Sequence, residues 1–88
     1  MLIEFLEAFE KDLDAISSEG IRRKVLKLIE HAELSSSLSD IPHIKKFSSF
    51  ISAYRIRLGD YRIGIFVIGE TIQFARILHR KDIYRVFP

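Results

Sequence analysis

The stretch YRIRLGDYR, residues 54–62, constrains the fold of this chain more than any other. Apolar and arginine side chains alternate up to Gly59-Asp60, and a period of two indicates a strand with one buried face. Gly59-Asp60 favours a tight turn, after which an apolar strand follows. We therefore predict a β-hairpin of residues 52–58 and 61–68, which brings together the arginines Arg55, Arg57 and Arg62.

These hairpin arginines allow two interpretations. Like charges opposite each other on neighbouring strands destabilise a sheet, so a structural reason for them is weak. They can form a solubilising polar face, with the arginine stems lying along the sheet. They can equally form a site for a polyanion, because arginine forks bind phosphate oxygens bidentately. The hairpin alone leaves both interpretations open.

Two amphipathic helices are expected before the hairpin. Apolar residues recur at helical spacing in residues 6–16 and again in residues 21–32, with charged residues on the opposite faces. Residues 17–20, SSEG, break this pattern and offer serines that can cap the second helix. Residues 2–5 suit either a first strand or the head of the first helix.

The C-terminal half is predicted to be a β-meander. A further strand, residues 71–79, follows the two-residue turn Gly69-Glu70, and its mixed faces are typical of a central strand. The short loops make the hairpins antiparallel. The expected fold is α+β in the order β-α-α-β-β-β, with two N-terminal helices packed on one face of a small, mainly antiparallel sheet. Residues 1–88 are expected to form a single domain.

The charges of the chain are unevenly distributed. Residues 1–42 hold 5 Lys/Arg against 9 Asp/Glu, a net charge of −4, whereas residues 43–88 hold 9 against 3, a net charge of +6. The basic half indicates an acidic partner, either nucleic acid or an acidic protein segment. The chain has no cysteine, and no apolar run approaches the roughly 20 residues that span a bilayer. We therefore expect a cytoplasmic protein with no membrane partner.

The basic residues fall in two clusters, each with a tyrosine: the hairpin and the terminal segment HRKDIYR. No P-loop, HExxH motif or Ser-His-Asp set is present, and the carboxylates of the basic half stand alone, so we expect no metal and no cofactor. A meander can place the main candidates around one shallow basin: Arg55, Arg57, Arg62, Arg80 and Tyr84. Further candidates for contact with RNA or phosphate are Lys45, Lys46 and Lys81.

The blocks YRIRLGDYRIGIFV and ILHRKDIYR resemble the RelE/ParE superfamily of type II toxin–antitoxin toxins, and the resemblance covers nearly the whole chain. RelE-like members are ribosome-dependent endoribonucleases that cut mRNA in the ribosomal A site, whereas ParE-like members inhibit DNA gyrase. The resemblance therefore implies a metal-independent mRNA endoribonuclease that inhibits translation, with mRNA and the ribosome as partners. A non-enzymatic gyrase inhibitor and a silenced, merely binding member are the alternatives. Each implies a cognate antitoxin encoded next door.

By this resemblance the catalytic roles fall on Arg62, Arg80, Tyr84 and His79. Arg55 and Arg57 stand where the best-known members have lysines. Because arginine does not readily lose a proton, neither is a plausible general base. Arg62 can stabilise the charge of a phosphorane, and Tyr84 can carry a proton or stack on a base. His79 can act as base or acid if its ring faces the basin, so the identity of the general base stays open.

Overall fold

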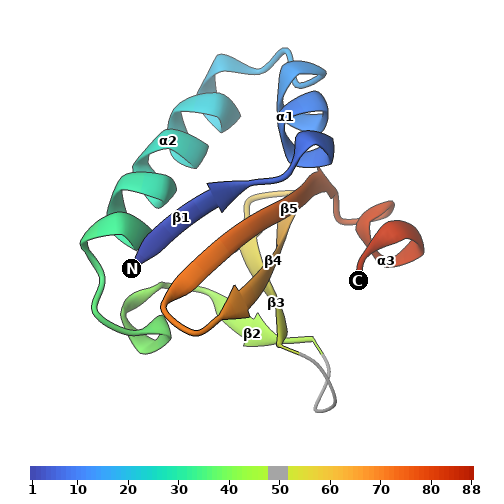
Figure 1. Cartoon of the computed structure of the whole chain (residues 1–88). Helices are drawn as coiled ribbons and strands as arrows, with labels where there is room; N and C mark the ends of the chain where they lie inside the picture. The colour runs from blue at the N-terminus through green and yellow to red at the C-terminus, as the bar shows by residue number, and fades with distance from the viewer. Residues whose placement is uncertain (48–51) are drawn as a thin grey trace.

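The computed structural model describes residues 1–47 and 52–88, which form a five-stranded sheet with two helices across one face (Figure 1). The α+β class, the two N-terminal helices and the mainly antiparallel sheet are as predicted. In chain order the elements are β1 (Leu2–Phe5), α1 (Glu7–Asp14), α2 (Glu19–Leu34), the 3₁₀ turn η1 (Leu38–Asp40), β2 (Ile44–Lys46), β3 (Ala53–Leu58), β4 (Tyr61–Ile68), β5 (Thr71–His79) and α3 (Ile83–Val86).

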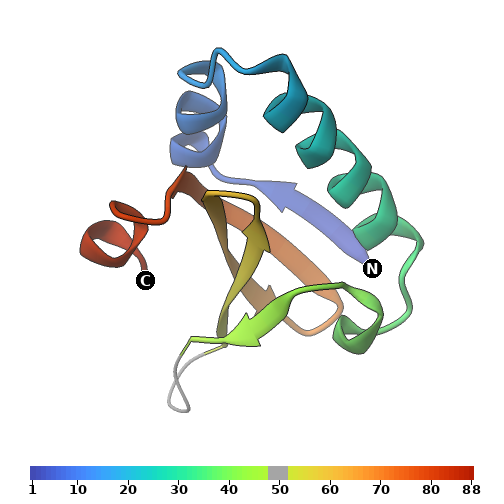
Figure 2. The same ribbon diagram turned by 180° about the vertical axis from the view of Figure 1, so that it is seen from behind.

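The strands lie in the order β1-β5-β4-β3-β2. The strand β1 pairs with β5 in parallel, and the other neighbours pair antiparallel. Residues 2–5 are therefore a strand, and they pair with residues of β5 that lie almost seventy positions later in the chain. Three elements were not predicted: η1 and the short strand β2, both within the polar connection, and α3 at the C-terminus. Figure 2 shows α3 beyond the end of β5, away from α2.

Both predicted two-residue turns are present. Gly59 and Gly69, at the first position of each turn, have φ values of +61° and +59°. A type II′ hairpin turn requires a positive φ at this position, which glycine adopts without steric conflict. The two turns therefore fix the register of β3, β4 and β5.

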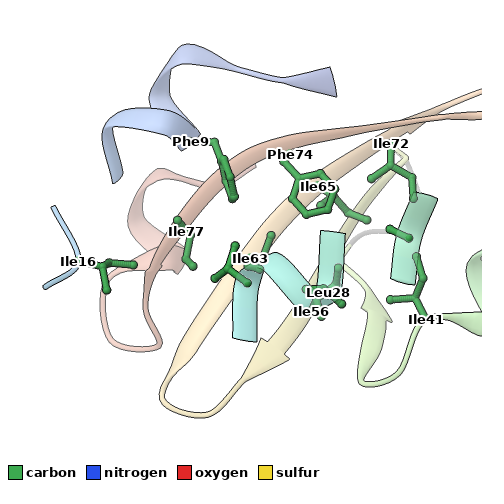
Figure 3. Packing of buried hydrophobic residues seen from close by; sticks show 12 residues of the cluster. Phe9, Ile16, Leu28, Ile41, Ile56, Ile63, Ile65, Ile72, Phe74 and Ile77 are labelled. Atoms are coloured by element: carbon green, nitrogen blue, oxygen red, sulfur yellow. The ribbon is translucent and has the colours of Figure 1, made fainter. Parts of the chain in front are cut away.

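The helix-covered face of the sheet holds the main core (Figure 3). Side chains of α1 and α2 such as Phe9 and Val25 are fully buried against the sheet. Strand β4 contributes every second residue to this side, as a half-buried sheet requires, whereas an irregularity in its pairing with β5 interrupts the alternation between Phe74 and Ile77. The buried strand residues of this core, which we call the helix-side core, are Ile56, Ile63, Ile65, Ile72, Phe74 and Ile77.

One ion pair ties α1 to β5. The carboxylate of Asp12 accepts hydrogen bonds from Arg76 Nε at 2.7 Å, Arg76 Nη2 at 3.0 Å and the backbone N of Ile77 at 3.1 Å. The hydrogen bonds that Arg76 donates to Asp12 raise the pKa of Arg76. Burial lowers this pKa, and the negative charge of Asp12 raises it further. A raised arginine pKa stabilises the fold at every pH below the ordinary value for arginine, so this contribution stays constant around neutrality.

The opposite face of the sheet carries a smaller apolar cluster under α3. Ile83 and Phe87 flank this helix and are buried, and they pack with Ala53 and Ala75 of the sheet. The ring of Phe87 lies over Gly64, where an added Cβ would come within 2.6 Å of it. A glycine in β4 therefore makes the room that lets α3 lie on the sheet.

Candidate functional site

The sheet face turned away from α1 and α2 carries a group of cations. Because Ile56 packs in the helix-side core, its neighbours Arg55 and Arg57 point to the other side of β3. Arg57 lies opposite Arg62 of β4, and Arg55 lies opposite Lys45 of β2. We call this surface the basic face and define it by Lys45, Arg55, Arg57 and Arg62.

A shallow depression of about 230 Å³ lies on the basic face. Tyr84 of α3 forms one wall, and its ring centroid lies 5.5 Å from that of Phe47. The side chain of Tyr84 is 53% exposed, so its hydroxyl is accessible. The residues lining the depression are Lys45, Lys46, Phe47, Arg55 and Tyr84. Arg55 of the hairpin cluster and Tyr84 of the terminal cluster therefore meet here, and the phenol shares the depression with three cations.

The position of Tyr84 depends on its neighbours in α3. Ile83 on one side and Phe87 on the other are buried in the small apolar cluster, so the helix presents Tyr84 outward. Phe87 in turn contacts Phe47 and Phe66, with ring centroids 5.6 Å and 5.0 Å apart. The packing of Phe87 thus sets where the phenol stands.

Arg62 is held at the turn end of the same face. Its Nη1 donates to the carbonyls of Gly59 at 2.8 Å and Tyr61 at 2.9 Å. Its Nε is buried and lacks a hydrogen-bond partner among the described residues. The backbone N of Arg80 donates to Asp60 in this turn at 2.8 Å, which brings the start of the terminal segment beside Arg62. Arg62 and Arg80 therefore form a second group at this turn, and neither residue lines the depression.

The remaining predicted residues lie apart from the depression or at its edge. The ring of His79 packs edge-on against Tyr61, with 5.9 Å between the ring centroids, and Tyr61 itself packs against the helix-side core. His79 Nδ1 accepts a hydrogen bond from the backbone N of Lys81 at 3.2 Å. The ring is therefore turned to the other side of the sheet. Lys81 is exposed in the turn after β5. The ammonium of Lys46 lies 5.9 Å from the ring centroid of Tyr54.

Sequence reasoning missed His43 and Phe47. His43 Nδ1 lies 3.1 Å from Arg57 Nη2, so its ring stands at the basic face. Phe47 supports Tyr84. Both residues flank β2, and no sequence pattern indicated that strand. Within the described ranges, no three His, Asp or Glu side chains gather in a way that can hold a metal ion.

Comparison with known proteins identifies the family. Residues 3–84 match the family model of the "ParE toxin of type II toxin-antitoxin system, parDE". The Toxin RelE3 of Methanocaldococcus jannaschii is 46% identical over 89 residues, and the match covers 100% of both chains. This chain therefore belongs to the RelE/ParE toxins of type II toxin–antitoxin systems, and its whole-length relative is of the RelE kind.

Solved structures agree with this assignment. The toxin in the RelB-RelE antitoxin–toxin complex from Methanococcus jannaschii has a TM-score of 0.83 at 45% identity, covering 97% of this chain and 99% of that one. The archaeal RelE-RelB complex from Pyrococcus horikoshii shares the fold, with a TM-score of 0.72 at 19% identity over 92% and 96% of the chains. No helix in the described part of the chain is long and apolar enough to cross a membrane.

Proposed function

We propose that this toxin is a ribosome-dependent mRNA endoribonuclease that inhibits translation. The observation that carries the proposal is the depression that Tyr84 lines together with Arg55 and Lys45. An accessible phenol among cations suits a phosphate whose charge grows during the reaction. The identity of 46% with a toxin named RelE, over the whole chain, supports the same function.

Cleavage of RNA without a metal has three requirements: removal of the 2′-hydroxyl proton, stabilisation of the phosphorane charge and protonation of the leaving 5′-oxygen. In the proposed reaction, Arg55 and Lys45 hold the phosphate, because arginine forks and ammonium groups bind its oxygens. Tyr84 donates a proton to the 5′-oxygen or stacks on the neighbouring base. Oriented cations are usually the largest single contribution to catalysis of this kind.

The second cationic group serves the same reaction in our proposal. Arg62 carries a buried Nε that lacks a partner among the described residues, and this donor suits an incoming phosphate oxygen. Arg57, Arg80, Lys81 and Lys46 contact the RNA backbone on either side of the cleaved bond. His79 contributes by fixing the turn after β5 through its bond with the N of Lys81.

Inhibition of DNA gyrase is the alternative, because the matching family model is described as a ParE toxin. We favour mRNA cleavage because the relative that matches over the whole chain is named RelE. Two related toxins were solved with RelB antitoxins, so we also propose a cognate antitoxin for this chain. An acidic segment of that partner would neutralise the basic face. Action on ribosomes implies a cytoplasmic location.

The test uses the purified toxin, an mRNA and ribosomes with a defined codon in the A site. We expect 5′ ends to form within that codon, and only when ribosomes are present. A parallel supercoiling assay with DNA gyrase should show no inhibition. Intact mRNA together with inhibited gyrase would contradict the proposal and support the alternative.

A further inference from the structure

His43 is joined to Arg57 through both backbone and side chain. The backbone N of Arg57 donates to the carbonyl of His43 at 3.2 Å, and Arg57 Nη2 lies 3.1 Å from His43 Nδ1. These two contacts fix the direction of an exposed ring. His43 also has a φ of +60°, a conformation that residues other than glycine adopt rarely and that often accompanies a functional site.

The contact with Arg57 defines the state of the imidazole. Arginine only donates hydrogen bonds, so the Nδ1 that faces it carries a lone pair and no proton. A neutral imidazole of this kind is a proton acceptor. The charged and titratable groups of the neighbouring elements are Arg57 of β3, Arg62 opposite it on β4, Lys45 two positions ahead on β2, and Lys24, Lys27 and His31 of α2, which line a hollow with Pro42.

We propose that His43 is the general base that accepts the 2′-hydroxyl proton during RNA cleavage. This inference rests on the proposed function and supplies the group which that function still lacks. The arginines cannot act as bases. His79, the other imidazole in question, faces Tyr61 on the helix-covered side. His43 instead stands within hydrogen-bond distance of Arg57, one of the cations of the basic face.

The proposed step begins when Arg57 turns toward a phosphate oxygen. Its guanidinium has other N–H donors, so it can bind the phosphate and leave the lone pair of His43 Nδ1 beside it. The 2′-oxygen then bonds to phosphorus, and its proton passes to Nδ1. The bond between phosphorus and the 5′-oxygen breaks, and that oxygen takes the proton of the Tyr84 hydroxyl, which solvent restores. The products are a 2′,3′-cyclic phosphate and a 5′-hydroxyl.

Two substitutions can remove the base while keeping the backbone. Asparagine tolerates a positive φ, and its amide oxygen can still accept a hydrogen bond from Arg57, so His43→Asn retains the contact without the imidazole. Glycine adopts a positive φ freely, so His43→Gly leaves the fold intact and opens space for added imidazole. His31→Gln is the matched control, because His31 lies on α2 and contacts the carbonyl of Asp40.

The experiment measures single-turnover cleavage of the A-site codon on programmed ribosomes between pH 5.5 and 8.5. We expect both His43 variants to cleave about 10²-fold or more slowly, with unchanged melting temperature and ribosome affinity. The fall of the wild-type rate at acid pH, where histidines titrate, should disappear in both variants. Added imidazole should restore part of the rate of His43→Gly but not of His43→Asn. His31→Gln should behave as wild type.

Two results would overturn the inference while leaving the proposed function standing. One is cleavage by His43→Asn within about threefold of wild type. The other is a slow variant that keeps the acid limb and does not respond to imidazole, which would make His43 a positioning residue for Arg57. Wild-type toxin that leaves mRNA intact on ribosomes would overturn the proposed function itself, and this inference with it.

Discussion

The two faces of the sheet differ in composition: one is covered by buried apolar side chains, and the other carries neighbouring side chains of like charge. The helix-side core is made of branched and aromatic side chains such as Ile63 and Phe74, which are fully buried. The basic face sets Arg57 against Arg62 and Arg55 against Lys45, pairs of like charge that weaken a sheet. Stability therefore resides mainly on one face, and the other is free to carry groups that stability alone would not favour.

Other local departures from stable structure also lie on the basic face. His43 has a positive φ, Arg62 has a buried Nε without a partner among the described residues, and Gly64 must lack a side chain. Groups that disagree with local rules are expected at functional sites, where a ligand or a reaction compensates for them. The contrast between the faces predicts two classes of substitution. Those in the helix-side core should lower stability, and those on the basic face should lower activity while the toxin stays folded.

The largest effect is expected from Phe74→Ala on the helix-side core. Phe74 is fully buried and contacts Phe9 with ring centroids 5.4 Å apart. Removing the ring should lower the free energy of unfolding by about 3–5 kcal/mol, measured by urea denaturation. Ile68→Ala is the control, because Ile68 is 60% exposed and should change stability by less than about 1 kcal/mol. Equal losses of the free energy of unfolding would contradict the claim that stability rests mainly on the helix-side core.

Tyr84→Phe should leave stability almost unchanged but slow cleavage. The phenol is half exposed, so its hydroxyl contributes little to stability, and the free energy of unfolding should stay within about 0.5 kcal/mol of wild type. Cleavage of A-site mRNA should slow by about 10²-fold, equivalent to about 2.7 kcal/mol in the barrier, because the leaving oxygen loses its proton donor. A variant as active as wild type would restrict Tyr84 to a stacking or structural role.

Glycine-to-alanine substitutions under α3 and in α2 should change the stability of the fold in opposite directions. At Gly64 the new Cβ would meet the ring of Phe87 at 2.6 Å, so Gly64→Ala should displace α3, lower stability by about 1–3 kcal/mol and slow cleavage. At Gly20 in α2 the nearest atom lies at 3.7 Å, so Gly20→Ala should raise stability by up to about 1 kcal/mol. The change in stability of each variant is measured by thermal unfolding. A Gly64→Ala toxin of unchanged stability and activity would show that Phe87 does not position Tyr84.

The smallest effect is expected from Lys45→Glu. The new carboxylate would stand opposite Arg55 and replace a repulsive pair by an attractive one, which should stabilise the fold by a few tenths of a kcal/mol. The same change should weaken ribosome-bound mRNA cleavage, because the depression loses a cation. Chemical denaturation and cleavage rates should therefore move in opposite directions. A rise in both stability and cleavage rate, or a fall in both, would contradict the division between the two faces.

Local patterns in the sequence predicted most of the fold. The alternation of residues 54–58, the turns at Gly59 and Gly69 and the helical stripes each depend on neighbours within a few positions, so they could be recognised directly. The strand β1, the strand β2 and the helix α3 depend on partners farther along the chain, which are β5, β3 and Gly64 respectively. No local pattern carries that information.

The same distinction explains the site. Residue type indicated that Arg55, Lys45 and Tyr84 could bind a phosphate. The pairing of β2 with β3 brings Lys45 beside Arg55, and the packing of α3 on the sheet adds Tyr84. Residue type did not indicate which histidine faces the cations, because strand pairing determines the direction of each imidazole. His79 pairs with Tyr61 and turns to the helix-covered side, whereas His43 reaches Arg57 through the start of β2. The resemblance to a family pointed to His79 because it compares positions along the chain rather than directions in space.

The RNA-facing surface can be mapped most directly by photo-crosslinking. An mRNA with 4-thiouridine in the A-site codon, bound to ribosomes with the Tyr84→Phe toxin to limit cleavage, would be irradiated and the adducts located by mass spectrometry. We predict adducts in residues 43–47 and in α3, which border the depression. Adducts on the outer surface of α2 with none on the basic face would contradict the assignment of the basic face as the surface that binds and cleaves mRNA.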